Sequence, residues 1–185
     1  MKSRYSTQIM ADEIAPAVLD SLRARIARVF PAQIRQCVEA LDDEQIWWRP
    51  NEGENSVGNI VLHVCGSLNH YLNRQIGGIP YERDREAEFA ERRHIPKTEL
   101  LQIFDDMVAK AEQTFDGLTP ERLGDPSPEP KMYQVVVQDL IGVATHLANH
   151  AGQVLWITKM LREGALDEVW MRTHKGLGGW VGRTP

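Results

Sequence analysis

The chain has 185 residues, 42% of them hydrophobic and 25% charged, which suits one globular domain with a core of its own. Its formal net charge of −5 argues against a nucleic-acid-binding protein, because affinity for phosphates needs clustered Lys and Arg. No apolar run approaches the roughly 20 residues that cross a bilayer, and residues 1–16 lack the apolar region of a signal peptide. We therefore predict a cytoplasmic protein with a single domain, residues 1–185, that binds neither nucleic acid nor membrane.

The first half of the chain predicts two long helices. Apolar residues recur at helical spacing over about residues 15–41, where Pro31 should kink the helix or split it. A second helix should begin at Ser56, or at Asn55 one residue earlier, since either side chain can cap free N–H groups. The glycine pair at residues 77–78 should end it.

The second half predicts two more helices and two irregular segments. Helical periodicity begins again near Pro96 and runs to Gly117, and the last long helix should span about residues 133–162. Residues 81–94 alternate in charge sign, so we expect an ordered connector with a solvated surface. The tail after residue 164 should be irregular structure that Trp170 and Trp180 dock onto the helices. With no convincing strand, the fold class is all-α, a helical bundle.

The two cysteines, Cys37 and Cys65, both lie at apolar helical positions and do not form a CxxC pair. We expect buried, reduced thiols rather than a disulfide or a metal site.

Two histidines on the last helix have the spacing of a metal site. His146 and His150 stand four residues apart, so both imidazoles share one helix face and can converge on one ion. Leu147 follows the first of them where the zinc-protease motif HExxH needs its catalytic Glu, which excludes that class. A third ligand has to come from elsewhere, and on the residues alone either His63 or His70 of the second helix qualifies.

A di-iron bundle is the rival architecture, and it would need two ExxH motifs with two further inward-facing glutamates. Glu91 and His94 make this motif once, in the connector and without a second copy, so we set the di-iron hypothesis aside.

Three motifs resemble one known family. They are NSVGNIVLH at the start of the second helix, RDREAEF in the connector, and HxxxHxGQ in the fourth helix. Together they resemble the DinB/YfiT-like superfamily, and more narrowly a branch of it of unknown function. The resemblance implies a four-helix bundle with up-down-down-up topology. It also implies a divalent metal bound by His63, His146 and His150, which selects His63 over His70.

The implied site has consequences for function. Three neutral histidines leave a coordination position open, which is the catalytic rather than the structural pattern for zinc. Some members of the superfamily are thiol-dependent transferases or isomerases, so the resemblance implies a metal-dependent enzyme acting on a small molecule, of the thiol transferase or hydrolase type. Nickel or zinc is the expected metal, with iron or manganese as alternatives. Three polar residues of the fourth helix are candidates for orienting the ligands: Asp139, Asn149 and Gln153.

The alternative hypothesis is a non-catalytic, metal-binding bundle of a stress response that dimerises. A homodimer is expected in either case, because bundles with spare apolar surface often pair. A polar pocket at an open metal position would favour the enzyme, and a fourth protein ligand would favour a structural role.

Overall fold

The computed structural model describes residues 2–164 and residue 166, with side chains from residue 13 onward. These residues form an all-α structure without a β-strand, and their one β-bridge joins Pro126 and Val135. The all-α class is therefore confirmed. The tail residues Trp170, His174 and Trp180 lie outside the described part of the chain, so the expected docking of the tail stays a prediction.

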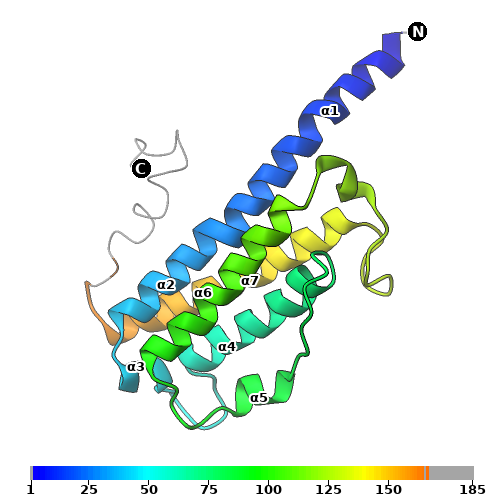
Figure 1. Ribbon diagram of the computed structural model, residues 1–185. Helices are drawn as coiled ribbons and strands as arrows, with labels where there is room; N and C mark the ends of the chain where they lie inside the picture. The colour runs from blue at the N-terminus through cyan, green and yellow to red at the C-terminus, as the bar shows by residue number, and fades with distance from the viewer. Residues whose placement is uncertain (1, 165, 167–185) are drawn as a thin grey trace.

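The first predicted helix is longer than expected and is built in three pieces. It comprises α1 (Lys2–Arg23), a π-helical segment η1 (Ala24–Val29) and α2 (Phe30–Ala40). Pro31 lies in the first turn of α2, where a missing N–H is tolerated, and the wider π turn precedes it. The proline thus divides the helix, as predicted, without ending it. The N-terminal part of α1 projects beyond the other helices (Figure 1).

The second long helix begins where its cap predicts. A short helix, α3 (Asp43–Trp47), comes first and was not expected within that connection. The side chain of Ser56 then accepts a hydrogen bond from the N–H of Asn59, which starts α4 (Val57–Leu68). A second π-helical segment, η2 (Asn69–Arg74), continues α4 and is followed by Gly78, whose φ is 69°.

The connector and the second half of the chain supply the remaining helices. The connector contains α5 (Arg85–Ala90), which Asp84 caps. Next come α6 (Lys97–Asp116), the short 3₁₀ helix η3 (Pro120–Gly124) and α7 (Val136–Leu161). The boundaries of α6 and α7 lie within a few residues of those predicted.

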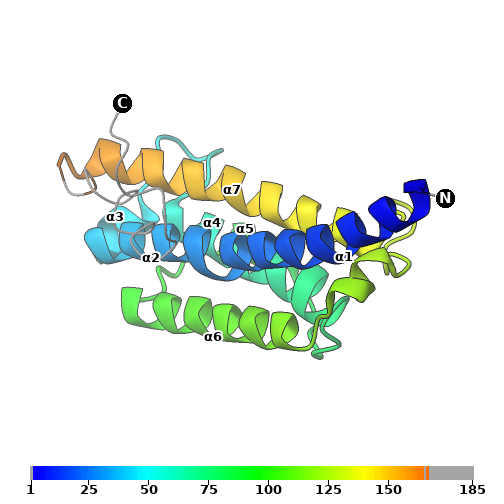
Figure 2. The same ribbon diagram turned by 90° about the horizontal axis from the view of Figure 1, so that it is seen from above.

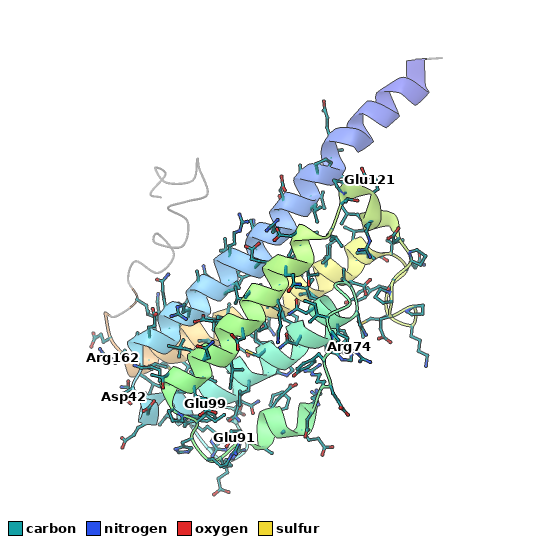
Figure 3. The ribbon with its side chains drawn as sticks, in the orientation of Figure 1. Asp42, Arg74, Glu91, Glu99, Glu121 and Arg162 are labelled. Atoms are coloured by element: carbon teal, nitrogen blue, oxygen red, sulfur yellow. The ribbon has the colours of Figure 1, made fainter. Side chains whose placement is uncertain are left out.

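The long helices pack side by side around one apolar core. α4 contacts α6 on one side and α7 on the other, α2 contacts both α6 and α7, and α5 lies on α4 (Figures 1 and 2). Asp42 after α2, Glu99 at the start of α6 and Arg162 after α7 lie at one end of the molecule (Figure 3). The core side chains from α6 and α7 are at most 1% exposed: Leu100, Phe104, Met107, Leu140, Leu147 and Val154. Cys37 and Cys65 are free and buried, as predicted.

Candidate metal centre

Three histidines from two helices meet in the middle of the molecule. His63 lies in the middle of α4 and is 7% exposed, and His146 and His150 lie one turn apart on the face of α7 that packs against α4. The ring centroids of each pair lie between 4.5 and 5.1 Å apart. One nitrogen from each ring lies within 4.8 Å of the other two.

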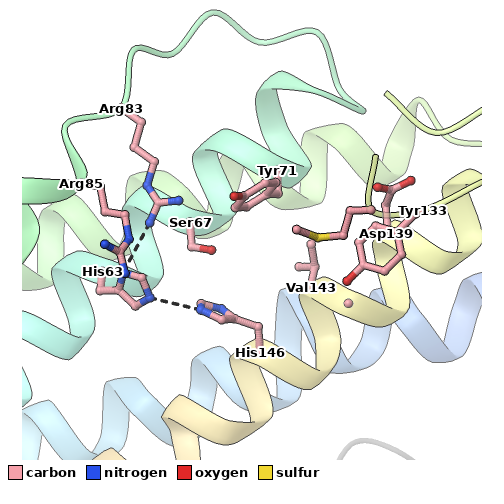
Figure 4. Close-up of a pocket in the computed structure, with 11 residues that line it drawn as sticks. His63, Ser67, Tyr71, Arg83, Arg85, Tyr133, Asp139, Val143 and His146 are labelled. Atoms are coloured by element: carbon pink, nitrogen blue, oxygen red, sulfur yellow. Dashed lines mark hydrogen bonds between the residues drawn. The ribbon is translucent and has the colours of Figure 1, made fainter. Parts of the chain in front are cut away.

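The spacing of the ring nitrogens fits a shared ion. His63 Nε2 and His146 Nε2 are 3.1 Å apart (Figure 4). Two ligands that each bind an ion at roughly 2.0–2.1 Å with a tetrahedral angle are separated by about 3.3 Å. The observed pair is therefore close to ligand geometry.

A buried ion pair sets the orientation of His63. The Nδ1–H of His63 donates to Glu88 Oε2 at 2.8 Å, which leaves the Nε2 lone pair facing His146. Arg83 holds the same carboxylate with two hydrogen bonds, Nε to Oε1 at 2.7 Å and Nη2 to Oε2 at 2.9 Å. The side chain of Glu88 is 7% exposed. A carboxylate behind a histidine is the usual support of a metal ligand, because it fixes the ring and raises its basicity.

A similar hydrogen bond orients the third ring. His150 Nδ1–H donates to Gln153 Oε1 at 2.8 Å, which directs the lone pair of Nε2 away from Gln153. His146 differs, since its Nδ1 is buried without a hydrogen-bond partner among the described residues. A buried imidazole whose second nitrogen faces another imidazole is poorly satisfied without a bound ion or water.

The surroundings keep the imidazoles of His63 and His146 neutral. Burial, together with the neighbouring rings of His150 and His63, lowers the pKa of His146 to about 4. Burial also lowers the pKa of His63, against the opposing effect of its hydrogen bond to Glu88. Both imidazoles are neutral near pH 7, so their lone pairs are available to a metal without release of a proton.

Two cavities reach the histidines from different sides. The cavity on the His146 side, called here the Asp139 cavity, has a volume of about 300 Å³ and is lined by polar side chains that include Tyr71, Arg85, Tyr133 and Asp139 (Figure 4). The cavity on the His150 side, called here the tryptophan cavity, has a volume of about 680 Å³ and is lined by Trp48, Phe89, Trp156 and Met160. His63 lines both cavities, so a group at the three rings is accessible from either side.

The sequence profile of the DinB superfamily matches residues 19–154, which include all three histidines and most of the helical body. The chain belongs to the DinB superfamily. A search of the curated proteins and a search of the solved structures found no match. None of the helices in the described part of this DinB protein is long and apolar enough to cross a membrane.

The DinB chain brings together the three histidines predicted as ligands and leaves His70 outside the cluster. His70 instead packs its ring against Tyr71 and lies 3.5 Å from Gln75. The triad is compatible with a divalent metal, whereas the motif of Glu91 and His94 is not part of it: Glu91 pairs with Arg93, and His94 stacks on Trp47.

The three polar candidates of α7 have different surroundings. Gln153 contacts His150 directly, as the orienting hypothesis expects. Asp139 lies two turns away and accepts a hydrogen bond from Ser127, and Asn149 is exposed and bonds none of the three rings.

Sequence reasoning missed the residues behind His63. Residues 81–94 were expected to be a solvated surface because their charges alternate, yet the side chains of Arg83 and Glu88 are only 11% and 7% exposed and lie against α4. The motif RDREAEF contains both residues, but nothing in their spacing distinguishes them from their exposed neighbours Arg85 and Glu86. Only the packing of α5 on α4 separates the two sets.

Proposed function

We propose that this DinB protein holds one divalent metal ion between α4 and α7 through His63, His146 and His150. The observation that supports this most strongly is the convergence of three imidazoles, two of them oriented by hydrogen bonds on their other nitrogen. Nickel or zinc is the proposed ion, with iron or manganese as alternatives, because imidazole ligands suit several of these metals.

The ligand set supports an open site. The cluster found among the described residues consists of three histidines, and Glu88 is committed to His63 and Arg83. A zinc site with three protein ligands keeps a position for water or substrate, whereas structural sites are closed by four.

We propose that the site is that of a metal-dependent enzyme acting on a small molecule, of the thiol transferase or hydrolase type. A bound divalent ion supplies Lewis acidity that stabilises an ionised water or thiol at neutral pH. The chain supplies the rest: Glu88 and Gln153 fix two of the rings, and the two cavities give substrates access from either side. This access favours an enzyme over the alternative, a non-catalytic metal-binding protein.

The test is a screen of the metal-loaded protein for transfer from low-molecular-weight thiols to electrophiles, and for ester and amide hydrolysis. We expect turnover that a variant with His146→Ala and His150→Ala loses at least about a hundredfold, because the ligands that position the ion are absent. Equal turnover by wild type and double variant would contradict a catalytic role for the triad.

We propose two further features for this chain, the helix topology of the family and a homodimer. The up-down-down-up topology of a four-helix bundle is supported by the ribbon, in which α1–α2 and α7 run toward one end of the molecule while α4 and α6 run away from it (Figures 1 and 2). A homodimer is supported by the exposed apolar side chains Ile14 and Ile141, which line one hollow between α1 and α7.

A further inference from the structure

The Asp139 cavity has a buried carboxylate that its own protein does not satisfy. Asp139 is 6% exposed, and its Oδ1 accepts a hydrogen bond from Ser127 Oγ at 3.0 Å. Its Oδ2 has no hydrogen-bond partner among the described residues. Burial raises the pKa of Asp139, and the nearby Glu129 raises it further. A buried carboxylate oxygen without a partner is costly, so a group that supplies a donor there is strongly favoured.

The opposite end of the same cavity is basic. Figure 4 shows Arg83 and Arg85 at the His63 end and Asp139 and Tyr133 at the other end, with His146 between them. Arg83 is already paired with Glu88, but the exposed Arg85 forms no ion pair with the described residues and lies 5.1 Å from the Phe89 ring. An unpaired guanidinium at the rim of a cavity is suited to a carboxylate or another anion.

We propose that the Asp139 cavity binds a zwitterionic small molecule of peptide-like size, with its amine at Asp139, its anionic group at Arg85 and its reactive centre facing His146. This inference rests on the proposed function, because its third contact is between the reactive centre of the molecule and the metal ion. The charges of the two ends are complementary to such a molecule and would oppose the reverse orientation. A volume of about 300 Å³ is at the small end of ligand cavities, which fits a molecule of two or three amino-acid units.

Hydroxyl groups in the Asp139 cavity add further contacts. The zwitterion occupies the side lined by Tyr71, Ser67 and Tyr133, whose hydroxyl groups can bond its backbone-like polar atoms. The tryptophan cavity on the His150 side is left for the reaction partner. Each then approaches the triad from its own side.

The test uses a tripeptide that matches this layout, glycylcysteinylglycine, in which the thiol stands between an amine and a carboxylate. Binding is measured to the cobalt(II)-loaded protein from the near-ultraviolet band of cobalt thiolate, alongside two derivatives, the N-acetyl peptide and the C-terminal amide. We expect each modification to weaken binding at least about tenfold in the wild type, because each removes one charge-assisted hydrogen bond.

Variants assign each loss to a residue. In Asp139→Asn, N-acetylation of the peptide should no longer weaken binding, whereas C-terminal amidation still should. In Arg85→Gln, amidation should no longer weaken binding, whereas N-acetylation still should. Asp20→Asn and Arg162→Gln are exposed changes outside the cavity, and in both variants each peptide modification should weaken binding as it does in the wild type. The comparison of the three peptides on the wild type does not depend on any variant folding.

Two negative results have different meanings. Equal affinities for all three peptides, with a clear thiolate band, would overturn the zwitterion site and leave the proposed function intact. Absence of a thiolate band with every peptide would contradict the thiol-dependent function and the zwitterion site together.

Discussion

At the scale of single residues, Glu88 determines how His63 faces the centre of the molecule. Its carboxylate receives the Nδ1–H of His63 and two hydrogen bonds from Arg83, all in a buried position. The pair thereby fixes one tautomer, in which Nε2 carries the lone pair. Loss of such a partner typically weakens metal binding about 10–100-fold.

Replacing that carboxylate should weaken metal binding. Glu88→Gln keeps the shape of the side chain but removes the charge, and it leaves the guanidinium of Arg83 without its partner. We expect the dissociation constant for zinc to rise about 10–100-fold, measured by competition with a chromophoric chelator. Glu86→Gln, an exposed change on the same helix, is the control and should leave the constant unchanged. Equal constants for both variants would show that Glu88 does not support the site.

The depressed pKa of His146 predicts how the metal-free protein responds to acid. Its pKa is about 4 in the folded chain and about 6.5 when unfolded, so between these two pH values the unfolded chain takes up a proton that the folded chain does not. This contribution to stability is therefore complete above pH 6.5 and is lost as the pH falls from about 6.5 through about 4. Burial of His63 acts in the same direction.

The comparison that checks this is urea unfolding of wild type and His146→Gln between pH 7.5 and 4.5, both with chelator present. We expect the free energy of unfolding of the wild type to fall more steeply over this interval, by up to about 1.4 kcal/mol per pH unit. Carboxylates titrate equally in both proteins, so their contribution cancels when the unfolding free energy of the variant is subtracted from that of the wild type at each pH. Parallel curves would contradict the burial of a neutral His146.

At the scale of elements, close packing of α5 on α4 positions the ion pair. Asn59 Nδ2 in the first turn of α4 donates to the backbone carbonyl of Glu88 at 3.1 Å, which ties the two helices together. One turn after His63, Gly66 provides the space that the Glu88 side chain occupies, because a Cβ atom there would collide with its carboxylate. The cap of α4 and one glycine thus place a residue that is 25 positions away from His63 in the chain.

Substitution of two helical glycines should have opposite effects. Gly66→Ala should displace Glu88, lower the free energy of unfolding by about 1–3 kcal/mol and weaken zinc binding as Glu88→Gln does. In Gly152→Ala the added Cβ meets no atom within 4 Å, so the higher helix propensity of alanine should raise stability by up to about 1 kcal/mol. Thermal unfolding and the chelator competition measure both effects. A stable Gly66→Ala variant with unchanged zinc affinity would contradict the packing described.

Local sequence signals predicted the helices and part of the site. Ser56 and Gly117 mark helix boundaries by chemistry that acts within a few residues, and the spacing of His146 and His150 follows from helix geometry alone. The choice between His63 and His70 needed more, since both lie on the second helix seven residues apart. The π-helical segment Asn69–Arg74 interrupts the regular period between them, and periodicity could not reveal it.

Long-range contacts explain what the sequence did not predict. Arg83 and Glu88 lie in a segment with the composition of a surface connector. Their side chains are only 11% and 7% exposed because α5 docks on α4, where His63 donates a hydrogen bond to the Glu88 carboxylate. Similarly, Asp139 was assigned to the histidines by its position on α7, whereas Ser127 in the preceding loop is its actual partner. Contacts of this kind depend on the tertiary arrangement and leave no mark in local spacing.

At the scale of the whole molecule, the apolar hollow between α1 and α7 predicts self-association. Ile14 is 52% exposed and Ile141 is 49% exposed, and both line this hollow. We expect the wild type to sediment as a dimer and Ile141→Glu as a monomer, because a buried unpaired charge opposes the contact. Met160→Glu changes an equally exposed residue of α7 beside the other cavity and should remain a dimer. A monomeric wild type would contradict the dimer.

The central claim is that α4 and α7 together bind one metal ion through three histidines. It is tested most directly by elemental analysis of the purified chain and its variants. We predict about one divalent ion per chain in the wild type and in His70→Ala, and almost none in His63→Ala or in the double variant His146→Ala and His150→Ala, with helical content retained by circular dichroism. Full metal occupancy in the double variant, or loss of the ion in His70→Ala alone, would contradict this account.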